Sequence, residues 1–163
     1  MFDDEDEQRD DPRELPLYKK GMEIYHVVDQ ICQLIPDEDD NPLAHIKSVI
    51  LEDAMMLTVK IAGASAGQLY DIKMEAAAII RKSVMNLMVQ NHSLDMFGFE
   101  HVEYFQIVRK LIDEYRLLFI DWVSKFDKWN YTIDRWGLFN PPGVGPFDLD
   151  PDDDIPFNGF DES

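Results

Sequence analysis

Apolar side chains recur every three or four residues in four separate stretches of this chain, a spacing that places them on one face of a helix. The members of the first stretch are Ile24, Val27, Val28, Ile31, Leu34 and Ile35. Pro36 ends this stretch, and a polar linker follows it. Asn41 and Pro42 predict the next helix start, because asparagine caps helices and proline is tolerated in their first turn. The second predicted helix therefore runs from about Leu43 to the small-residue segment 63–67.

The third predicted helix, over residues 68–91, is apolar around most of its circumference. Its inner face holds the usual apolar stripe, and a second apolar set falls outside that stripe. The members of this second set are Met74, Val84, Met85, Met88 and Val89. A helix that is apolar nearly all round is buried on more than one side, so we expect these five residues to form an oligomer or partner interface. The alternative is a thick core within one chain.

The strongest helical pattern covers residues 99–130, after a predicted turn at 92–98. Large side chains alternate steps of three and four residues there without a break, as in the heptads of closely packed helices. These side chains are Phe105, Val108, Ile112, Tyr115, Phe119, Trp122, Phe126 and Trp129. At 1.5 Å per residue, this helix would be roughly 48 Å long.

Four helices with short connections, and no alternating strand pattern, predict an all-α fold in the form of an antiparallel up-down four-helix bundle. The predicted organisation is an acidic flexible head at 1–14, the bundle at 15–130 and an acidic-aromatic tail at 131–163. Both tails are expected to be disordered, because acidic segments of this kind bury too little apolar surface to offset the entropy of ordering.

The net charge of −18 is concentrated at the two ends of the chain. Residues 1–14 hold eight acidic and two basic side chains, and residues 141–163 hold seven acidic and no basic ones. The intervening chain is therefore only mildly acidic. This distribution disfavours nucleic-acid binding by the whole molecule, because phosphate contacts need clustered lysine and arginine. It disfavours binding to anionic membranes for the same reason.

The single cysteine, Cys32, excludes an internal disulfide and fits a reducing compartment. The first residues lack the basic and apolar regions of a signal peptide. No apolar run reaches the length that a membrane-spanning helix needs. We therefore expect a cytoplasmic protein.

Five large apolar side chains interrupt the acidic tail. A tail of this kind can fold onto a basic, apolar groove of a partner, and the alternative is a tail that only adds solubility. The candidate anchors are Phe147, Leu149, Ile155, Phe157 and Phe160. A separate candidate surface is a basic strip on the third helix, formed by Lys73, Arg81 and Lys82. Its alternative is the ordinary charge of a solvated helix face.

Metal-binding and catalytic motifs are incomplete in this sequence. A di-iron bundle needs two Glu-x-x-His pairs, and only Glu23 with His26 makes one. Three alternating aspartates from residue 148 imitate the start of a calcium loop, but Asp153 and Gly159 stand where that loop needs glycine and glutamate. Residues 63–67 spell G-x-S-x-G without the strand-to-helix turn of a hydrolase. We therefore expect no catalytic residue, cofactor or metal.

Three segments resemble a bacterial family of four-helix bundles. They are residues 24–36, Lys60-Ile61-Ala62-Gly63-Ala64 and Leu69-Tyr70-Asp71. The family includes ribosomal-RNA intervening-sequence proteins and the accessory variability determinant of diversity-generating retroelements, and the resemblance covers about residues 17–130. It implies a homopentamer without catalytic activity that, in the retroelement branch, binds a reverse transcriptase and helps engage its template RNA. This chain departs from that branch in being acidic, which disfavours direct RNA contact.

The residues leave three functional hypotheses open. The leading one is a non-enzymatic, homo-oligomeric helical adaptor that binds a protein, such as a reverse transcriptase or another nucleic-acid enzyme. The second is an acidic decoy that mimics nucleic acid and occupies a basic cleft. The third and least favoured is a metal-binding bundle built on Glu23 and His26.

Overall fold

The four predicted helices are all present in the structure. The computed structural model describes residues 10–38 and 40–150, which contain four α helices and no strand. The α helices are α1 (Pro16–Cys32), α2 (Pro42–Ser65), α3 (Tyr70–Met96) and α4 (Phe105–Ser124). Two short 3-10 helices accompany them, η1 (Pro12–Glu14) and η2 (Val102–Tyr104). The predicted all-α, four-helix fold is therefore confirmed for the described residues.

The starts of α1 and α2 lie where the proline and asparagine signals place them. Pro16 and Pro42 are the first helical residues. The N–H at this position has no partner within the helix, so proline, which lacks it, costs no helical hydrogen bond there. The Asn41 side chain accepts a hydrogen bond from the Leu43 N–H at 3.0 Å. Local sequence is therefore sufficient to set these two helix starts.

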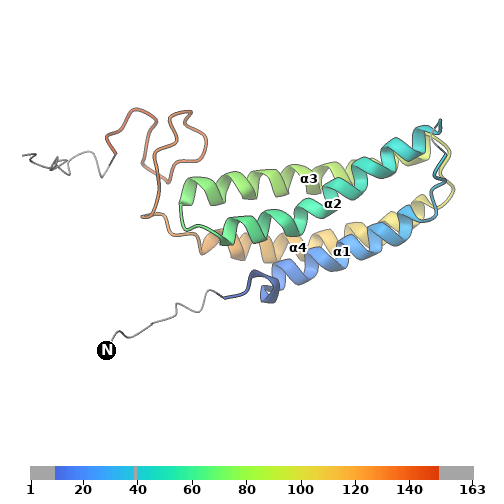
Figure 1. The fold of residues 1–163 in the computed structure, drawn as a ribbon, viewed down its shortest axis with the longest axis horizontal. Helices are drawn as coiled ribbons and strands as arrows, with labels where there is room; N and C mark the ends of the chain where they lie inside the picture. The colour runs from blue at the N-terminus through green and yellow to red at the C-terminus, as the bar shows by residue number, and fades with distance from the viewer. Residues whose placement is uncertain (1–9, 39, 151–163) are drawn as a thin grey trace, which may run out of the picture.

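The helices lie alongside one another, with α1 against α2 and α4, and α3 against α2 and α4. In Figure 1 the α1–α2 and α3–α4 connections lie at one end of the molecule, and the α2–α3 connection lies at the other. Contact is most extensive between α2 and α3 and sparsest between α3 and α4. One lateral face of the molecule is therefore less tightly closed than the others.

Three helices meet at the backbone carbonyl of Leu57 in the middle of α2. The buried Tyr115 hydroxyl of α4 donates a hydrogen bond to the Leu57 oxygen at 3.0 Å. Gly21 of α1 is buried beside the same carbonyl, and a Cβ atom there would lie 2.8 Å from the Leu57 oxygen. This close approach explains why α1 carries a glycine in mid-helix, where glycine otherwise costs stability.

The predicted turn at 92–98 is wrong for most of its length, because α3 continues to Met96. Leu94 is fully buried, one heptad after the equally buried Leu87, so core packing extends the helix past the polar residues of this region. The chain turns at Gly98, whose φ of +85° is a conformation that glycine adopts readily.

The fourth helix is shorter than the predicted span of 99–130. Phe99 and Phe126 are both buried, yet they lie outside α4, which covers only Phe105–Ser124. Loops at both ends supply core side chains, and Phe126 continues the helical spacing beyond the end of α4, so the spacing alone overestimates the helix. Trp129, the last member of the predicted series, is 92% exposed and does not belong to the core.

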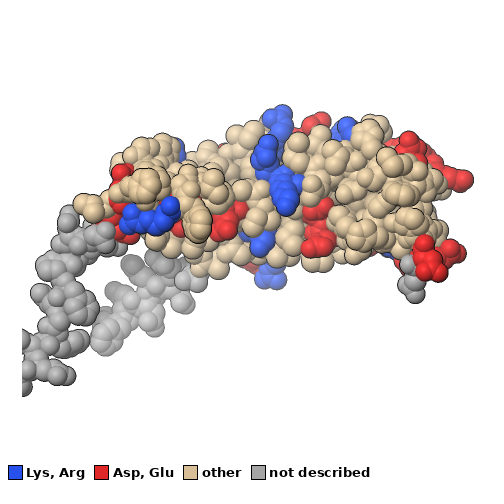
Figure 2. Space-filling model, turned by 90° about the horizontal axis from the view of Figure 1, so that it is seen from above, with Lys and Arg blue, Asp and Glu red and all other residues tan. Residues whose placement is uncertain are grey.

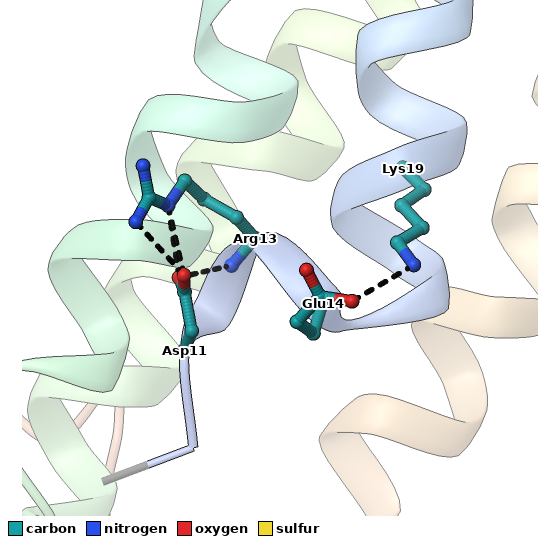
Figure 3. A network of polar contacts seen from close by, with 4 residues as sticks. All are labelled: Asp11, Arg13, Glu14 and Lys19. Atoms are coloured by element: carbon teal, nitrogen blue, oxygen red, sulfur yellow. Dashed lines mark hydrogen bonds and ion pairs between the residues drawn. The ribbon is translucent and has the colours of Figure 1, made fainter.

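The predicted flexible head includes structured residues. Asp11 caps η1 by accepting a hydrogen bond from the Arg13 N–H at 3.0 Å, and it pairs with the Arg13 guanidinium at 2.9 Å. These hydrogen bonds lower the pKa of Asp11. Glu14 pairs with Lys19 of α1 at 3.1 Å (Figure 3). Residues 10–14 of the predicted head 1–14 therefore make defined contacts, whereas 1–9 lie outside the described residues.

Cys32 ends α1 within the core. Its side chain is 1% exposed, and burial raises the pKa of the thiol to about 11, so it is protonated at neutral pH. A protonated, buried thiol is a weak nucleophile and behaves as a small apolar side chain. None of the helices in the described part of the chain has the length and apolar content to cross a membrane.

Candidate functional site

Residues 131–150, which we call the C-terminal loop, are organised around the carboxylate of Asp134. This carboxylate accepts hydrogen bonds from three backbone N–H groups, at distances of 2.8 to 2.9 Å. The donors are Trp136, Leu138 and Phe139. The three N–H donors lower the pKa of Asp134. Asn140 completes the turn, because its side chain both donates to the Asp134 carbonyl and accepts from the Asp134 N–H.

The C-terminal loop is attached to the N-terminal end of α3. The Tyr70 N–H donates to the Asn130 carbonyl at 2.8 Å, and Asp71 accepts a hydrogen bond from the Thr132 N–H at 3.0 Å. Ile133 is buried next to these contacts. The prediction of a disordered tail from residue 131 onward is therefore wrong for 131–150, because side-chain carboxylates satisfy the backbone of this irregular segment.

The far part of the loop is closed by an arginine. The Arg135 guanidinium donates hydrogen bonds to the Pro146 carbonyl at 3.2 Å and to the Asp148 carbonyl at 2.7 Å. The Asp148 carboxylate in turn accepts from the Gly145 N–H at 2.8 Å. These contacts fix the backbone conformation of the segment that carries Phe147 and Leu149.

Large apolar side chains on and beside this loop point into solvent. We call them the exposed apolar set: Trp129, Trp136, Leu138, Phe147 and Leu149. Their exposed fractions run from 75% to 95%, with Phe147 the highest. The set includes two of the predicted tail anchors, Phe147 and Leu149. The other three predicted anchors, Ile155, Phe157 and Phe160, lie outside the described residues.

A second candidate surface is an apolar groove of about 420 Å³ between α3 and α4, which we call the α3–α4 groove. Its apolar lining comes from both helices and includes Ile80, Val84, Met85, Met88, Ile112, Phe119 and Ile120. Arg81, Arg116 and Asp113 also line it. At one side of the groove, Arg109 of α4 donates to the Met88 carbonyl of α3 at 2.9 Å. The groove occupies the sparsely packed face noted above.

The five residues of the predicted interface occupy different environments. Val84 and Met88 are half-buried and line the α3–α4 groove, and Met85 lines it while 48% exposed. Met74 packs against a small cluster that contains Tyr70 and Phe126. Val89 is 53% exposed and is not part of the groove lining. The structure thus brings three of the five together, and their role in an interface stays a prediction.

The three residues of the predicted basic strip also separate. The Lys73 ammonium lies 5.5 Å from the centre of the Phe126 ring, and Arg81 lines the α3–α4 groove. Lys82 is one position, or about 100°, further round α3. Figure 2 shows lysine and arginine side chains gathered across the middle of one face, with acidic side chains beside them and at the ends. Arg116 is the arginine that α4 contributes to the groove.

One buried carboxylate is incompletely paired. Asp53 of α2 is 9% exposed, and the Asn86 side chain of α3 donates to its Oδ1 at 3.4 Å. Its Oδ2 accepts no hydrogen bond from the described residues. Burial raises the pKa of Asp53, and the hydrogen bond from Asn86 partly offsets this effect. No groove among those described reaches this carboxylate, so we assign it no binding role.

Glu23 and His26 do not form part of a larger ligand cluster. Lys20 donates to Glu23 at 2.8 Å and to Glu114 of α4 at 2.7 Å, so these carboxylates belong to an ion-pair network that links α1 and α4. His26 is exposed, and its ring contacts that of Tyr25. In residues 10–38 and 40–150, no group of three His, Cys, Asp or Glu side chains is arranged to hold a metal ion.

No protein-family model, curated protein or solved structure matches this chain. Two surfaces of the structure are therefore the candidates for a functional site. They are the exposed apolar set on the C-terminal loop and the α3–α4 groove. Both present apolar side chains at the surface, and Arg81, Asp113 and Arg116 also line the groove.

Proposed function

We propose that this chain is a non-enzymatic, oligomeric helical adaptor that binds a protein partner through apolar side chains held on ordered elements. The observation that carries this proposal is the exposed apolar set. Phe147 is 95% exposed, and Trp129 and Trp136 are each more than 90% exposed. Several large apolar side chains left exposed within one short segment of the chain are characteristic of an interaction site.

The backbone beneath these side chains supports the proposal. A segment that only improved solubility would not need Asp134, Asn140 and Arg135 to hold its backbone in one conformation. An ordered backbone lowers the entropy lost when a partner binds. Tryptophan and other aromatic residues dominate the binding energy of many protein interfaces. The loop therefore has the properties of a preorganised protein-binding element.

The kind of partner follows from charge and from the family resemblance. Asp127, Asp134 and Asp148 are one or two residues away in sequence from members of the exposed apolar set, which favours a partner with a basic surface. Enzymes that act on nucleic acids have such surfaces, and the resemblance in residues 17–130 indicates a reverse transcriptase. The proposal also includes the up-down topology and the homopentamer that this resemblance implies, in a cytoplasmic protein.

Binding to a purified reverse transcriptase of a diversity-generating retroelement tests the adaptor hypothesis. Trp136→Ala removes an exposed aromatic side chain without removing a backbone contact, so we expect affinity to fall at least about tenfold. Leu117→Ala is the control, because Leu117 is 62% exposed on α4 and lies outside both surfaces. Calorimetry that shows no binding by the wild-type chain would contradict this part of the proposal.

The acidic decoy remains the second candidate, because the chain has a net charge of −18. Removing residues 1–9 and 151–163 takes away ten acidic side chains and one arginine. An adaptor that binds through the exposed apolar set should keep its partner after this truncation, whereas a decoy should lose most of its affinity and most of its salt dependence. The two hypotheses therefore predict opposite results for the same truncated protein.

Native mass spectrometry of the full chain at micromolar concentration tests the oligomer. We expect a closed assembly, and the family resemblance predicts five copies. A strictly monomeric protein would exclude the oligomeric part of the proposal, while adaptor binding would remain testable by calorimetry.

A further inference from the structure

The α3–α4 groove has the properties of a site for a short apolar segment. Its volume of about 420 Å³ is within the range of about 300–1,000 Å³ that is usual for binding pockets. Side chains such as Val84, Met88 and Phe119 supply an apolar surface, and Arg81 and Arg116 also line the groove. Asp113 is the acidic residue of the lining, so basic residues outnumber acidic ones there.

The C-terminal loop carries a segment that matches this lining. Residues 147–150 read Phe-Asp-Leu-Asp, in which apolar and acidic side chains alternate. Phe147 and Leu149 are 95% and 78% exposed, so neither is in contact with the bulk of its own chain. An apolar groove with surplus arginine and an exposed apolar segment with aspartates are complementary in both polarity and charge.

The loop does not reach the groove of its own chain. It is attached to the first residues of α3 through the Tyr70 and Asp71 hydrogen bonds. The groove begins at Ile80, ten residues along the helix, which corresponds to about 15 Å. Arg135 holds the segment through the Pro146 and Asp148 carbonyls. Figure 1 shows the loop at the end of the molecule, beyond the helices.

We propose that Phe147 and Leu149 of one copy enter the α3–α4 groove of a second copy, with the neighbouring aspartates facing Arg81 and Arg116. Both halves of the contact are present in each chain, so no further protein is needed to complete it. A contact between two different surfaces is heterologous, and its repetition closes into a ring when the rotation allows. The inference rests on the proposed function in one respect, which is that the chain is an oligomer. In that oligomer Phe147 and Leu149 are covered, and Trp129, Trp136 and Leu138 of the exposed apolar set remain for the protein partner.

Two single substitutions separate the halves of this contact. Phe147→Asp alters the loop, and Ile120→Asp alters the groove, where Ile120 is 52% exposed. We expect each variant to weaken self-association at least about tenfold in sedimentation velocity experiments. Leu138→Asp and Leu117→Asp are the matched controls, because both residues are at least as exposed as Ile120 and neither belongs to the contact.

Mixing the two variants gives the decisive measurement. The Phe147→Asp chain keeps an intact groove, and the Ile120→Asp chain keeps an intact loop. The loop of the second variant can therefore still enter the groove of the first. We expect a heterodimer from two proteins that are each monomeric alone. Far-UV circular dichroism of each variant checks that the helices are retained.

Failure of this inference differs from failure of the proposed oligomer. If the wild type assembles, and Phe147→Asp and Ile120→Asp leave that assembly unchanged, the loop-to-groove contact is wrong and the oligomer stands. Monomeric variants that give no heterodimer on mixing would also overturn the contact. A wild type that is monomeric in sedimentation overturns both statements.

Discussion

At the scale of single residues, polar atoms in the core link the helices at defined points. Tyr115 of α4 and Gly21 of α1 both meet the Leu57 carbonyl of α2. Asp53 of α2 and Asn86 of α3 form a second, weaker link at 3.4 Å. The two links differ in how fully their polar atoms are paired. The Leu57 carbonyl accepts a hydrogen bond from Tyr115, whereas Oδ2 of Asp53 accepts no hydrogen bond from the described residues.

The Tyr115→Phe substitution should lower the free energy of unfolding by about 1–2 kcal/mol. It removes a buried hydroxyl that donates to the Leu57 oxygen, while the ring and its packing remain. Urea denaturation followed by circular dichroism measures the change. Tyr104→Phe is the control, because Tyr104 is 42% exposed, and we expect it to have almost no effect. Equal effects of the two substitutions would contradict a role for the buried hydrogen bond.

The Asp53→Asn substitution should raise the free energy of unfolding by about 1 kcal/mol at pH 7, because it removes a buried charge that is incompletely paired. The pKa of Asp53 is raised in the folded state, so folding favours its protonated form. The contribution of Asp53 to the free energy of unfolding is therefore fully present below its unfolded-state pKa of about 4. This contribution is lost as the pH rises through the pKa of Asp53 in the folded state. The difference between variant and wild type should shrink toward acid pH.

Urea denaturation at a series of pH values measures this dependence. Glu52→Gln is the matched control, because Glu52 is the exposed neighbour of Asp53 on the same helix. A gain for Asp53→Asn that is the same at pH 4 and pH 7 would show that burial of its charge is not the cause.

At the scale of elements, helix packing decides which glycines matter. Gly21 and Gly63 both stand within helices, α1 and α2. A Cβ at Gly21 would meet backbone at 2.8 Å, whereas a Cβ at Gly63 would meet nothing within 4 Å. The same residue type is therefore a packing requirement at one position and a local weakness of the helix at the other.

Alanine at these two positions should have opposite effects. Gly21→Ala should destabilise the protein by about 1–3 kcal/mol, because α1 has to move away from the Leu57 backbone. Gly63→Ala should stabilise it by about 0.5–1 kcal/mol, since alanine loses less conformational entropy in a helix. Thermal and urea unfolding of both variants measure the pair. A stabilising Gly21→Ala would show that α1 and α2 are not in contact here.

The C-terminal loop should open locally when Asp134 is replaced by alanine. Three N–H groups lose their acceptor, so hydrogen exchange at Trp136, Leu138 and Phe139 should accelerate at least about tenfold, with the helices unaffected. The pKa of Asp134 is lowered, so its contribution is present above pH 4 and is lost as the pH falls through the folded pKa. Asp127→Ala, which removes the acceptor of a single N–H, is the control.

At the scale of the whole molecule, net charge and exposed apolar surface have opposite effects on compactness and association. The chain has a net charge of −18, of which residues 10–150 account for −9. Self-repulsion of this size opposes the compact state, and salt screens it. The exposed apolar set and the α3–α4 groove act in the other direction, because each favours contact with another surface.

Raising the salt concentration should therefore stabilise the full chain. Between about 0.02 and 0.3 M sodium chloride we expect the Tm to rise by about 2–4 °C. The fragment 10–150 should show a smaller rise, because half of the net charge is gone. Differential scanning calorimetry of the two proteins at low concentration measures the difference. A fall in Tm with salt for the full chain would mean that ion pairs, such as Lys20 with Glu114, outweigh the repulsion.

The sequence by itself determined the number of helices and the positions where α1 and α2 begin. These features depend on local physics: the three- and four-residue spacing of apolar side chains, the Asn41 cap and the prolines at the first helical positions. It also identified Phe147 and Leu149 as apolar side chains without a place in the helical pattern. Signals of this kind need only the neighbouring residues, so they can be read along the chain.

Only the tertiary structure decided where α3 and α4 end, because burial of Leu94 extends one helix and loops supply Phe99 and Phe126 to the core beside the other. Only the fold showed that residues 131–150 are ordered. That order depends on hydrogen bonds from backbone N–H groups to the carboxylates of Asp71 and Asp134, and the spacing of apolar residues along the chain does not predict such bonds. The α3–α4 groove brings Arg81 and Arg116 together from separate helices. Contacts between residues far apart in the chain arise from packing, which no local pattern contains.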